Sequence, residues 1–212
     1  METNLCNHRV YIRITNVCNK ACNFCFVKND PKASTFISVD QVKQIVEFEL
    51  SRHNPSAPLR VQLSGGEPSL HPELKTIIAE ILQYDGVRLL LETNASNLNN
   101  SDYLDIIKAF PRKLTLKISL NSELITSNSE WEENVNYFLG QNLPVLYYFG
   151  GRYKDEADKK YLEQIISKNN LQHVGLYPVM DCDFFADRPH KVLSCIIYDV
   201  DGSVLADLRS IK

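Results

Sequence analysis

Short apolar runs alternate with amphipathic segments along almost the whole chain. Runs rich in β-forming residues occur at 9–15, 60–65, 87–94, 114–120, 144–150 and 173–180. Between them, apolar residues recur at helical spacing at 38–50, 72–84, 104–110, 130–140 and 155–168. This alternation predicts a parallel sheet with right-handed crossovers, and the apolar strands predict burial on both of its faces.

The last part of the chain departs from this alternation. Asp201-Gly202 stands between two apolar runs in residues 194–208, which is a strong hairpin signal. We therefore expect a main α/β unit over residues 1–181. Residues 182–212 form a short extension with a β-hairpin, and this extension is not an independent domain.

Composition narrows the class of protein. The chain has 212 residues, of which 44% are hydrophobic and 23% charged, so one hydrophobic core can form without stabilising disulfides or a structural metal. The net charge of −3 gives no indication of a nucleic-acid or membrane partner. The N-terminus has no apolar targeting segment, so we expect a cytoplasmic protein. In that compartment the 6 cysteines favour metal binding or catalysis over disulfides.

Polar and glycine-rich signals follow one strand after another. In open parallel sheets, sites lie at the carboxyl ends of the strands. The cysteine-rich stretch CNKACNFC (18–25) follows the first expected strand, SGGEP (64–68) the second and Thr93-Asn94 the third. Residues 119–121 end the fourth strand, and residues 150–152 follow the fifth. We expect all of them on the same rim of the sheet.

The thiols of Cys18, Cys22 and Cys25 are the most specific chemical signal. Iron–sulfur clusters ordinarily take four cysteine ligands. A cluster held by three thiolates keeps one iron open to a ligand from outside the protein. The alternative is a structural zinc site, completed by a distant ligand such as His8 or Cys6.

CNKACNFC resembles the cysteine loop of the radical S-adenosylmethionine (radical SAM) enzymes, and SGGEP resembles that superfamily's second motif. The resemblance covers nearly the whole chain. It implies a partial (β/α)6 TIM-like barrel with one 4Fe–4S cluster on Cys18, Cys22 and Cys25. It also implies that S-adenosylmethionine is cleaved reductively to a 5′-deoxyadenosyl radical, which abstracts hydrogen from a substrate.

The resemblance further assigns cofactor contacts near the first two strands. Phe24 is expected beside the adenine ring. Gly65, Gly66 and Glu67 are expected to bind the methionine ammonium through backbone carbonyls and the carboxylate. Glycine at these positions allows close backbone approach.

Later strands supply the remaining expected cofactor contacts. Asn94 matches the Thr-Asn pair that ends the third strand in the superfamily. Ser119 and Asn121 resemble polar positions that hold the ribose or the methionine carboxylate. Tyr177, on the sixth strand, resembles the segment that packs on adenine.

The substrate side is less defined by the sequence. Arg152 and Cys182 are the catalytic candidates, and we expect a wide cleft beside the sixth strand, lined by them and by Tyr147 or Tyr148. Each of these residues also has an ordinary packing or surface role as its alternative. Cys195 resembles the start of an auxiliary-cluster motif, but Asp207 stands where its second cysteine is expected, so we expect one cluster only.

Several functions remain open at this level. The substrate is a small molecule or a peptide, and the electron comes from a flavodoxin- or ferredoxin-type partner. The alternatives are the activation of a glycyl-radical enzyme and a non-catalytic iron–sulfur protein that senses redox state.

Overall fold

The structure, a computed structural model, describes residues 9–23, 25, 34–127, 129–178 and 195–207. One sheet has the strand order β6-β5-β4-β3-β2-β1-β7-β8, and its first six strands along the chain run parallel. The strands are β1 Arg9–Thr15, β2 Leu59–Gly65, β3 Val87–Thr93, β4 Leu114–Leu120, β5 Leu146–Tyr153, β6 Val174–Pro178, β7 Cys195–Tyr198 and β8 Val204–Asp207.

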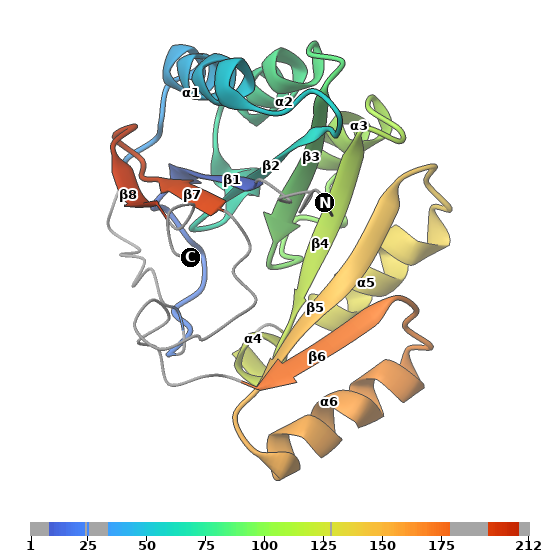
Figure 1. Cartoon of the computed structure of the whole chain (residues 1–212). Coiled ribbons are helices and arrows are strands. Elements are labelled where there is room, and N and C mark those ends of the chain that lie inside the picture. Colours follow the sequence, from blue (N-terminus) through green and yellow to red (C-terminus); the bar gives the residue numbers. More distant parts are fainter. Residues whose placement is uncertain (1–8, 24, 26–33, 128, 179–194, 208–212) are drawn as a thin grey trace, which may run out of the picture.

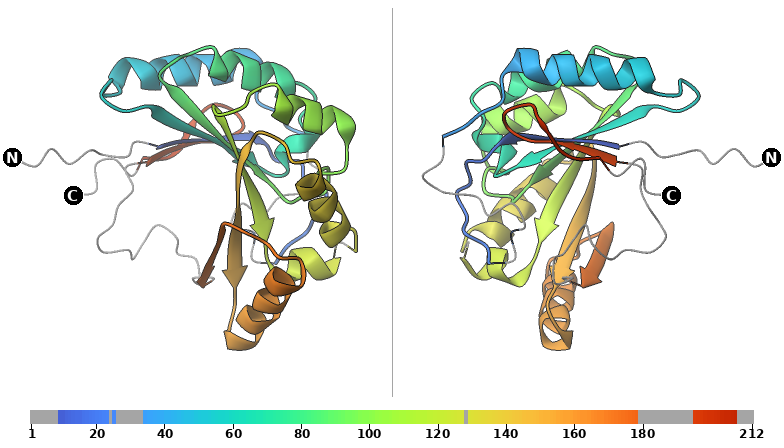
Figure 2. Two further views of the ribbon diagram at one scale, coloured as in Figure 1. Left: turned by 90° about the vertical axis from the view of Figure 1, so that its right-hand side faces the viewer. Right: turned by 60° about the vertical axis from the view of Figure 1, so that its left-hand side comes forward.

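Helices cover the outer side of this curved sheet (Figures 1 and 2). They are α1 Val39–Arg52, η1 Pro68–Leu70, α2 Leu74–Leu82, α3 Ser101–Lys108, α4 Ser122–Ser127, α5 Trp131–Gly140 and α6 Glu156–Lys168. A capping box begins α1, where Ser38 Oγ accepts from the Gln41 amide and the Gln41 side chain accepts from the Ser38 amide. Because β6 and β8 remain as edges, the sheet is an open barrel, as the sequence predicts.

Two details of the predicted elements were wrong. The short helix α4 lies in a stretch for which the sequence indicated no helix. Strand β5 continues through Gly151 and Arg152, which were expected in the loop after the strand. Pairing with β4 on one side and β6 on the other extends the strand past its glycines.

Burial alternates along the strands, so burial on both faces was also wrong. On β1 and β4 every second residue is fully buried beneath the helices, and the residues between them are partly exposed. Since side chains of a strand point alternately to opposite faces, the sheet has an apolar outer face and a polar inner face. The inner face carries Arg9, Tyr11, Arg13, Arg60, Gln62, Ser64, Arg88, Leu90, Glu92, Thr115, Lys117, Ser119, Tyr148, Arg152 and Tyr177.

The outer face and the helices form the apolar core. Ile77 and Ile78 of α2 are fully buried, together with Ile12 of β1 and Leu63 of β2. Each fully buried aliphatic side chain contributes about 1.5–3 kcal/mol relative to exposure. This layer holds the strands in place, and the carboxyl ends of β1 to β4 therefore lie at one rim.

The C-terminal hairpin forms as predicted around Gly202, whose φ of 82° suits glycine. Strand β7 pairs in parallel with β1, so the hairpin extends the β1 edge of the sheet (Figure 1). An ion pair joins Arg13 Nη1 to Asp199 Oδ1 at 2.7 Å. Tyr198 donates its hydroxyl to Glu49 of α1 at 2.6 Å. Within the described part of the chain, no strand pairs with the other edge of β6.

Among the described residues, no helix has the length and apolar character needed to cross a membrane.

Candidate active site

The cysteine loop begins directly after β1, and Cys18, Cys22 and Cys25 are each partly exposed on it. Burial raises the pKa of the Cys22 thiol to about 11, and the neighbouring Cys18 and Cys25 add to this shift. Burial also raises the pKa of Cys18, with Cys25 among the smaller causes. The three thiols are thus close enough to affect one another's pKa. Within the described part of the chain, no His, Cys, Asp or Glu group of three or more has the arrangement of a single-ion site.

The SGGEP turn after β2 holds the base of this loop by backbone hydrogen bonds. The Gly66 amide donates to the Thr15 carbonyl at 2.7 Å, and the Glu67 amide donates to the Val17 carbonyl at 2.8 Å. Gly65 has a φ of 131°, which disfavours any side chain. A Cβ on Gly66 would overlap the Val17 carbonyl. Both glycines are therefore needed because the backbone of the cysteine loop lies against them.

Glu67 is buried at 1% exposure, and its carboxylate connects the turn to the end of β3. It accepts hydrogen bonds from the Ser69 amide at 3.1 Å, the Thr93 hydroxyl at 2.9 Å and the Asn94 amide at 2.6 Å. Burial raises the pKa of this carboxyl, and the donors from Asn94 and Ser69 oppose that shift. The carboxylate thus positions the SGGEP turn against the end of β3. The sequence predicted only its contact with a ligand ammonium and not this role.

Asn94 links the end of β3 to the cysteine loop. Its Nδ2 donates to Asn19 Oδ1 at 2.8 Å and lies 3.9 Å from Cys18 Sγ, a weak sulfur hydrogen bond. The next residue, Ala95, has a φ of 70°, which is uncommon without glycine. Asn134 of α5 donates to the Ala95 carbonyl at 3.2 Å and supports this bend. The predicted residue Asn94 therefore contacts a predicted cluster ligand.

A third contact, which sequence reasoning missed, holds the middle of the loop. Glu123 of α4 accepts from the Asn23 amide at 2.8 Å and also pairs with Lys154. The ion pair with Lys154 and the hydrogen bonds from Asn23 hold the pKa of Glu123 below its usual range, against its desolvation. No sequence signal marks this contact, because Asn23 and Glu123 are 100 positions apart.

The site thus combines a cysteine loop with the ends of β2, β3 and β4, and comparison with known proteins identifies the family. The sequence profile described as the Radical SAM superfamily matches residues 12–165. The chain belongs to the radical SAM superfamily.

Two curated relatives are enzymes by name. A 7,8-dihydro-6-hydroxymethylpterin dimethyltransferase from Methanocaldococcus jannaschii is 30% identical over 98 residues, 46% of this chain and 19% of the relative. A GTP 3′,8-cyclase from Synechococcus elongatus is 28% identical over 132 residues, 58% of this chain and 39% of the relative. This radical SAM chain therefore matches less than half the length of either relative.

Solved structures agree with the fold at low sequence identity. Streptococcus suis SuiB bound to S-adenosylmethionine has a TM-score of 0.64 at 14% identity, covering 87% of this chain and 43% of SuiB. Native anSMEcpe with bound AdoMet also has a TM-score of 0.64 at 14% identity, covering 82% of this chain and 53% of that one. Both likenesses support the open radical SAM barrel.

The other predicted cofactor residues lie on or near the same rim. Ser119 lies on the inner face near the end of β4, beside Gly150 of β5. Asn121 is buried at 6% exposure, and its Oδ1 accepts from the Leu124 amide at 2.7 Å, so it caps α4. Tyr177 is 57% exposed on the inner face of β6. The capping bond gives Asn121 a structural role that the resemblance did not include.

The residues predicted to line the substrate cleft lie on different faces of the sheet. The Arg152 guanidinium lies 5.7 Å from the centre of the Tyr177 ring, in cation–π range. Tyr148 lies on the inner face, and Tyr147 lies on the outer face against Phe138, with ring centres 5.5 Å apart. The expectation that one of the two tyrosines faces inward is confirmed, and it is Tyr148.

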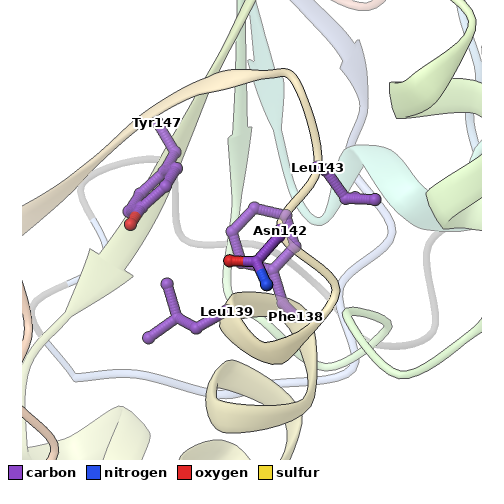
Figure 3. A pocket seen from close by; sticks show the side chains of 5 residues that line it. All are labelled: Phe138, Leu139, Asn142, Leu143 and Tyr147. Atoms are coloured by element: carbon purple, nitrogen blue, oxygen red, sulfur yellow. The ribbon is translucent and has the colours of Figure 1, made fainter.

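Tyr147 instead lines a small outer cavity with Phe138, Leu139, Asn142 and Leu143 (Figure 3). A second surface cavity lies near His53 and Gly86. Neither of these two cavities is lined by Arg152 or Tyr148, so the wide cleft expected beside the sixth strand stays a prediction.

Some predicted positions lie outside the described residues. These are Phe24, Cys182, Cys6 and His8. Cys195 and Asp207 are described only as backbone of β7 and β8.

A buried polar network on the inner face was also missed. The Glu92 carboxylate accepts from Gln62 Nε2 at 2.9 Å and from Ser64 Oγ at 3.1 Å, and it pairs with Lys117. Lys117 holds the pKa of Glu92 below its usual range against the effect of burial. The alternation of LRVQLSG, VRLLLET and LTLKISL could have indicated these residues, because each strand places its polar side chains on one face.

The contacts of Glu67 lead to the first testable prediction. In Glu67→Gln an amide N–H replaces one acceptor oxygen and faces the donors from Asn94, Thr93 or Ser69. Leaving a buried donor unsatisfied costs about 1–3 kcal/mol, so the free energy of unfolding should fall by that amount in urea denaturation. Glu73→Gln, at an exposed position of the same connection, is the matched control and should leave stability unchanged. Equal stability of Glu67→Gln and the wild type would contradict the positioning role.

Proposed function

We propose that this chain binds one 4Fe–4S cluster through Cys18, Cys22 and Cys25 and binds S-adenosylmethionine beside it, over the ends of β2 to β6. The observation that carries the proposal is the docking of the cysteine loop on the SGGEP turn, through the hydrogen bonds from Gly66 and Glu67 to the loop carbonyls. Three partly exposed thiols on one loop that is held in place by backbone hydrogen bonds fit such a cluster.

When bound, the cluster and S-adenosylmethionine supply one-electron reductive cleavage of a carbon–sulfur bond, which gives methionine and a 5′-deoxyadenosyl radical that takes hydrogen from a substrate. The protein supplies binding, orientation and exclusion of water. The electron comes from a flavodoxin- or ferredoxin-type partner.

The residues of this chain have distinct roles in the proposal. The backbone of the SGGEP turn binds the methionine ammonium, and the Glu67 carboxylate keeps that turn joined to the end of β3. Asn94 orients Cys18 through its side-chain amide. Glu123 holds the loop near Cys22 through the Asn23 amide.

Other predicted contacts complete the proposed cofactor site. Ser119, on the inner face at the rim, contacts the ribose or the methionine carboxylate, and Asn121 keeps the loop after β4 in place. Tyr177 is exposed and available to pack on adenine. Arg152, beside it, is available to contact the substrate.

The substrate is a small molecule or a peptide, and two observations favour a small molecule. The names of the two curated relatives refer to small molecules, a pterin and GTP. The inner face of the sheet is polar and charged, which suits a polar ligand more than apolar peptide side chains.

The function is tested with anaerobically reconstituted protein, S-adenosylmethionine and dithionite. We expect release of 5′-deoxyadenosine, measured by chromatography, and none when dithionite is omitted. Reconstituted protein that binds no S-adenosylmethionine and releases no 5′-deoxyadenosine would instead indicate a non-catalytic iron–sulfur protein.

A further inference from the structure

Positive charge is concentrated on the inner face of the sheet. The chain as a whole has a net charge of −3. The described inner face nevertheless has one carboxylate, Glu92, against the basic side chains of Arg9, Arg13, Arg60, Arg88, Lys117 and Arg152. The excess of positive charge is therefore a property of the inner face and not of the chain as a whole.

Three of these basic residues form a row across neighbouring strands, here named the arginine row. Arg9 of β1 is directly opposite Arg60 of β2, and Arg60 is directly opposite Arg88 of β3. Adjacent strands are about 4.8 Å apart, and like charges directly opposite each other on a sheet are destabilising. The fold therefore maintains an unfavourable arrangement at this place.

The arginine row differs from the other basic residues in its partners. Lys117 pairs with Glu92, and Arg13 pairs with Asp199. No ion pair within the described chain includes a member of the arginine row. Arg88 Nη1 donates to the carbonyl of the adjacent Val87 at 3.1 Å, which does not neutralise its charge.

The row is accessible and directed toward the concave side of the sheet. Arg60 and Arg88 are exposed, and Arg9 is partly buried. Burial raises the pKa of Tyr11 to about 12, and the positive charge of Arg9 opposes this shift. The same charge acts on Tyr148 of β5, across the inner face, where burial is again the main cause of a raised pKa. Arg9 is therefore close enough to affect both tyrosines.

Guanidinium groups recognise phosphate well, because their planar donors match its oxygens in pairs. Three of them side by side span about 10 Å of the sheet, which suits linked phosphate groups more than a single carboxylate. The row is at the start of the strands, and Arg9 precedes Thr15 at the rim by six residues, about 20 Å at 3.3 Å per residue. A ligand that reaches from the row toward the rim has the size of a nucleotide.

We propose that the inner face binds a phosphorylated small molecule of nucleotide size, with its phosphate groups on Arg9, Arg60 and Arg88. This inference rests on the proposed function, because it names the substrate class of that same site. Tyr11 and Tyr148 lie between the row and the rim and offer aromatic surfaces to the rest of the molecule.

Inorganic triphosphate is the probe, and calorimetry on the reconstituted protein gives its affinity. We expect the wild type to bind triphosphate, with an affinity that falls as salt increases. The double variant Arg60→Gln/Arg88→Gln should bind about tenfold more weakly or worse. The matched control is Arg52→Gln/Lys75→Gln, which removes the same charge at exposed positions of α1 and α2 on the outer side of the sheet and should bind as the wild type does.

Folding is checked by thermal unfolding of the same variants. The row variant should have a Tm equal to or above that of the wild type, because it removes repulsion between like charges. The proposed function is tested separately, by release of 5′-deoxyadenosine from the wild type without substrate, and the control variant should release as much as the wild type does. If the wild type releases no 5′-deoxyadenosine, the proposed function fails, but the measured affinity for triphosphate still tests the arginine row.

Three results would overturn the inference. They are no binding of triphosphate by the wild type, equal weakening in the row and control variants, and tighter binding of hexaglutamate than of triphosphate. The last would identify an acidic peptide as the ligand of this face.

Discussion

Simultaneous replacement of Cys18, Cys22 and Cys25 by alanine is expected to abolish iron loading. Reconstituted wild type should hold about four irons per chain, as a 4Fe–4S cluster requires, and the triple variant should hold almost none. The three thiols share one partly exposed loop and affect one another's pKa, so no other described group replaces them. Iron and sulfide quantitation after anaerobic reconstitution measures the effect.

The control for this prediction is Cys195→Ala, a cysteine of β7 outside the loop. It should leave the iron content unchanged, since Asp207 interrupts the auxiliary motif that Cys195 resembles. Iron that stays near four per chain in the triple variant would refute the ligand assignment. Iron lost in Cys195→Ala would refute the single cluster.

Gly66→Ala is expected to prevent correct docking of the cysteine loop. The added Cβ would overlap the Val17 carbonyl oxygen and lie 3.1 Å from the backbone carbon of Asn16, and backbone cannot move aside cheaply. The loop must shift, and the hydrogen bonds from Gly66 to Thr15 and from Glu67 to Val17 are lost. We expect a loss of about 2–4 kcal/mol in the free energy of unfolding and severely reduced iron loading. Urea denaturation and iron quantitation report these two effects.

Gly140→Ala is the matched control, because a Cβ there meets nothing within 4 Å. It lies at the end of α5, where alanine should be neutral or stabilise by up to about 1 kcal/mol. Normal iron loading in Gly66→Ala would show that the cysteine loop does not depend on the SGGEP turn. In that case, the observation that carries the proposed function would fail.

The sequence by itself determined the order of the elements and indicated three cysteines as candidate ligands. Cys18, Cys22 and Cys25 lie within eight residues, so their spacing in the sequence is enough to indicate a shared metal site. The strands and most helices were predicted because their periodicities are set by neighbouring residues. The SGGEP glycines were correctly expected to permit close approach, although the partner is the backbone of the cysteine loop and not only a ligand.

Tertiary structure decided how the site is held together. Glu67 to Thr93, Asn94 to Cys18 and Asn23 to Glu123 are contacts between segments 26, 76 and 100 residues apart. No spacing rule connects such pairs, because the path of the chain around the sheet brings them together. For this reason the structure adds a role to Glu67, that of a buried acceptor that joins two strand ends.

Tertiary structure also decided which strand faces are polar and where the hairpin lies. The runs LRVQLSG and VRLLLET contain the charged and polar positions, but only register aligns Arg60 with Arg88 and brings Glu92 to Lys117. The hairpin signal at Asp201-Gly202 predicted a turn, and it could not predict the pairing of β7 with β1, because strand pairing depends on which edge the folded sheet leaves free. Local sequence therefore predicts the elements and the candidate cysteine ligands, whereas long-range packing decides the contacts that position them.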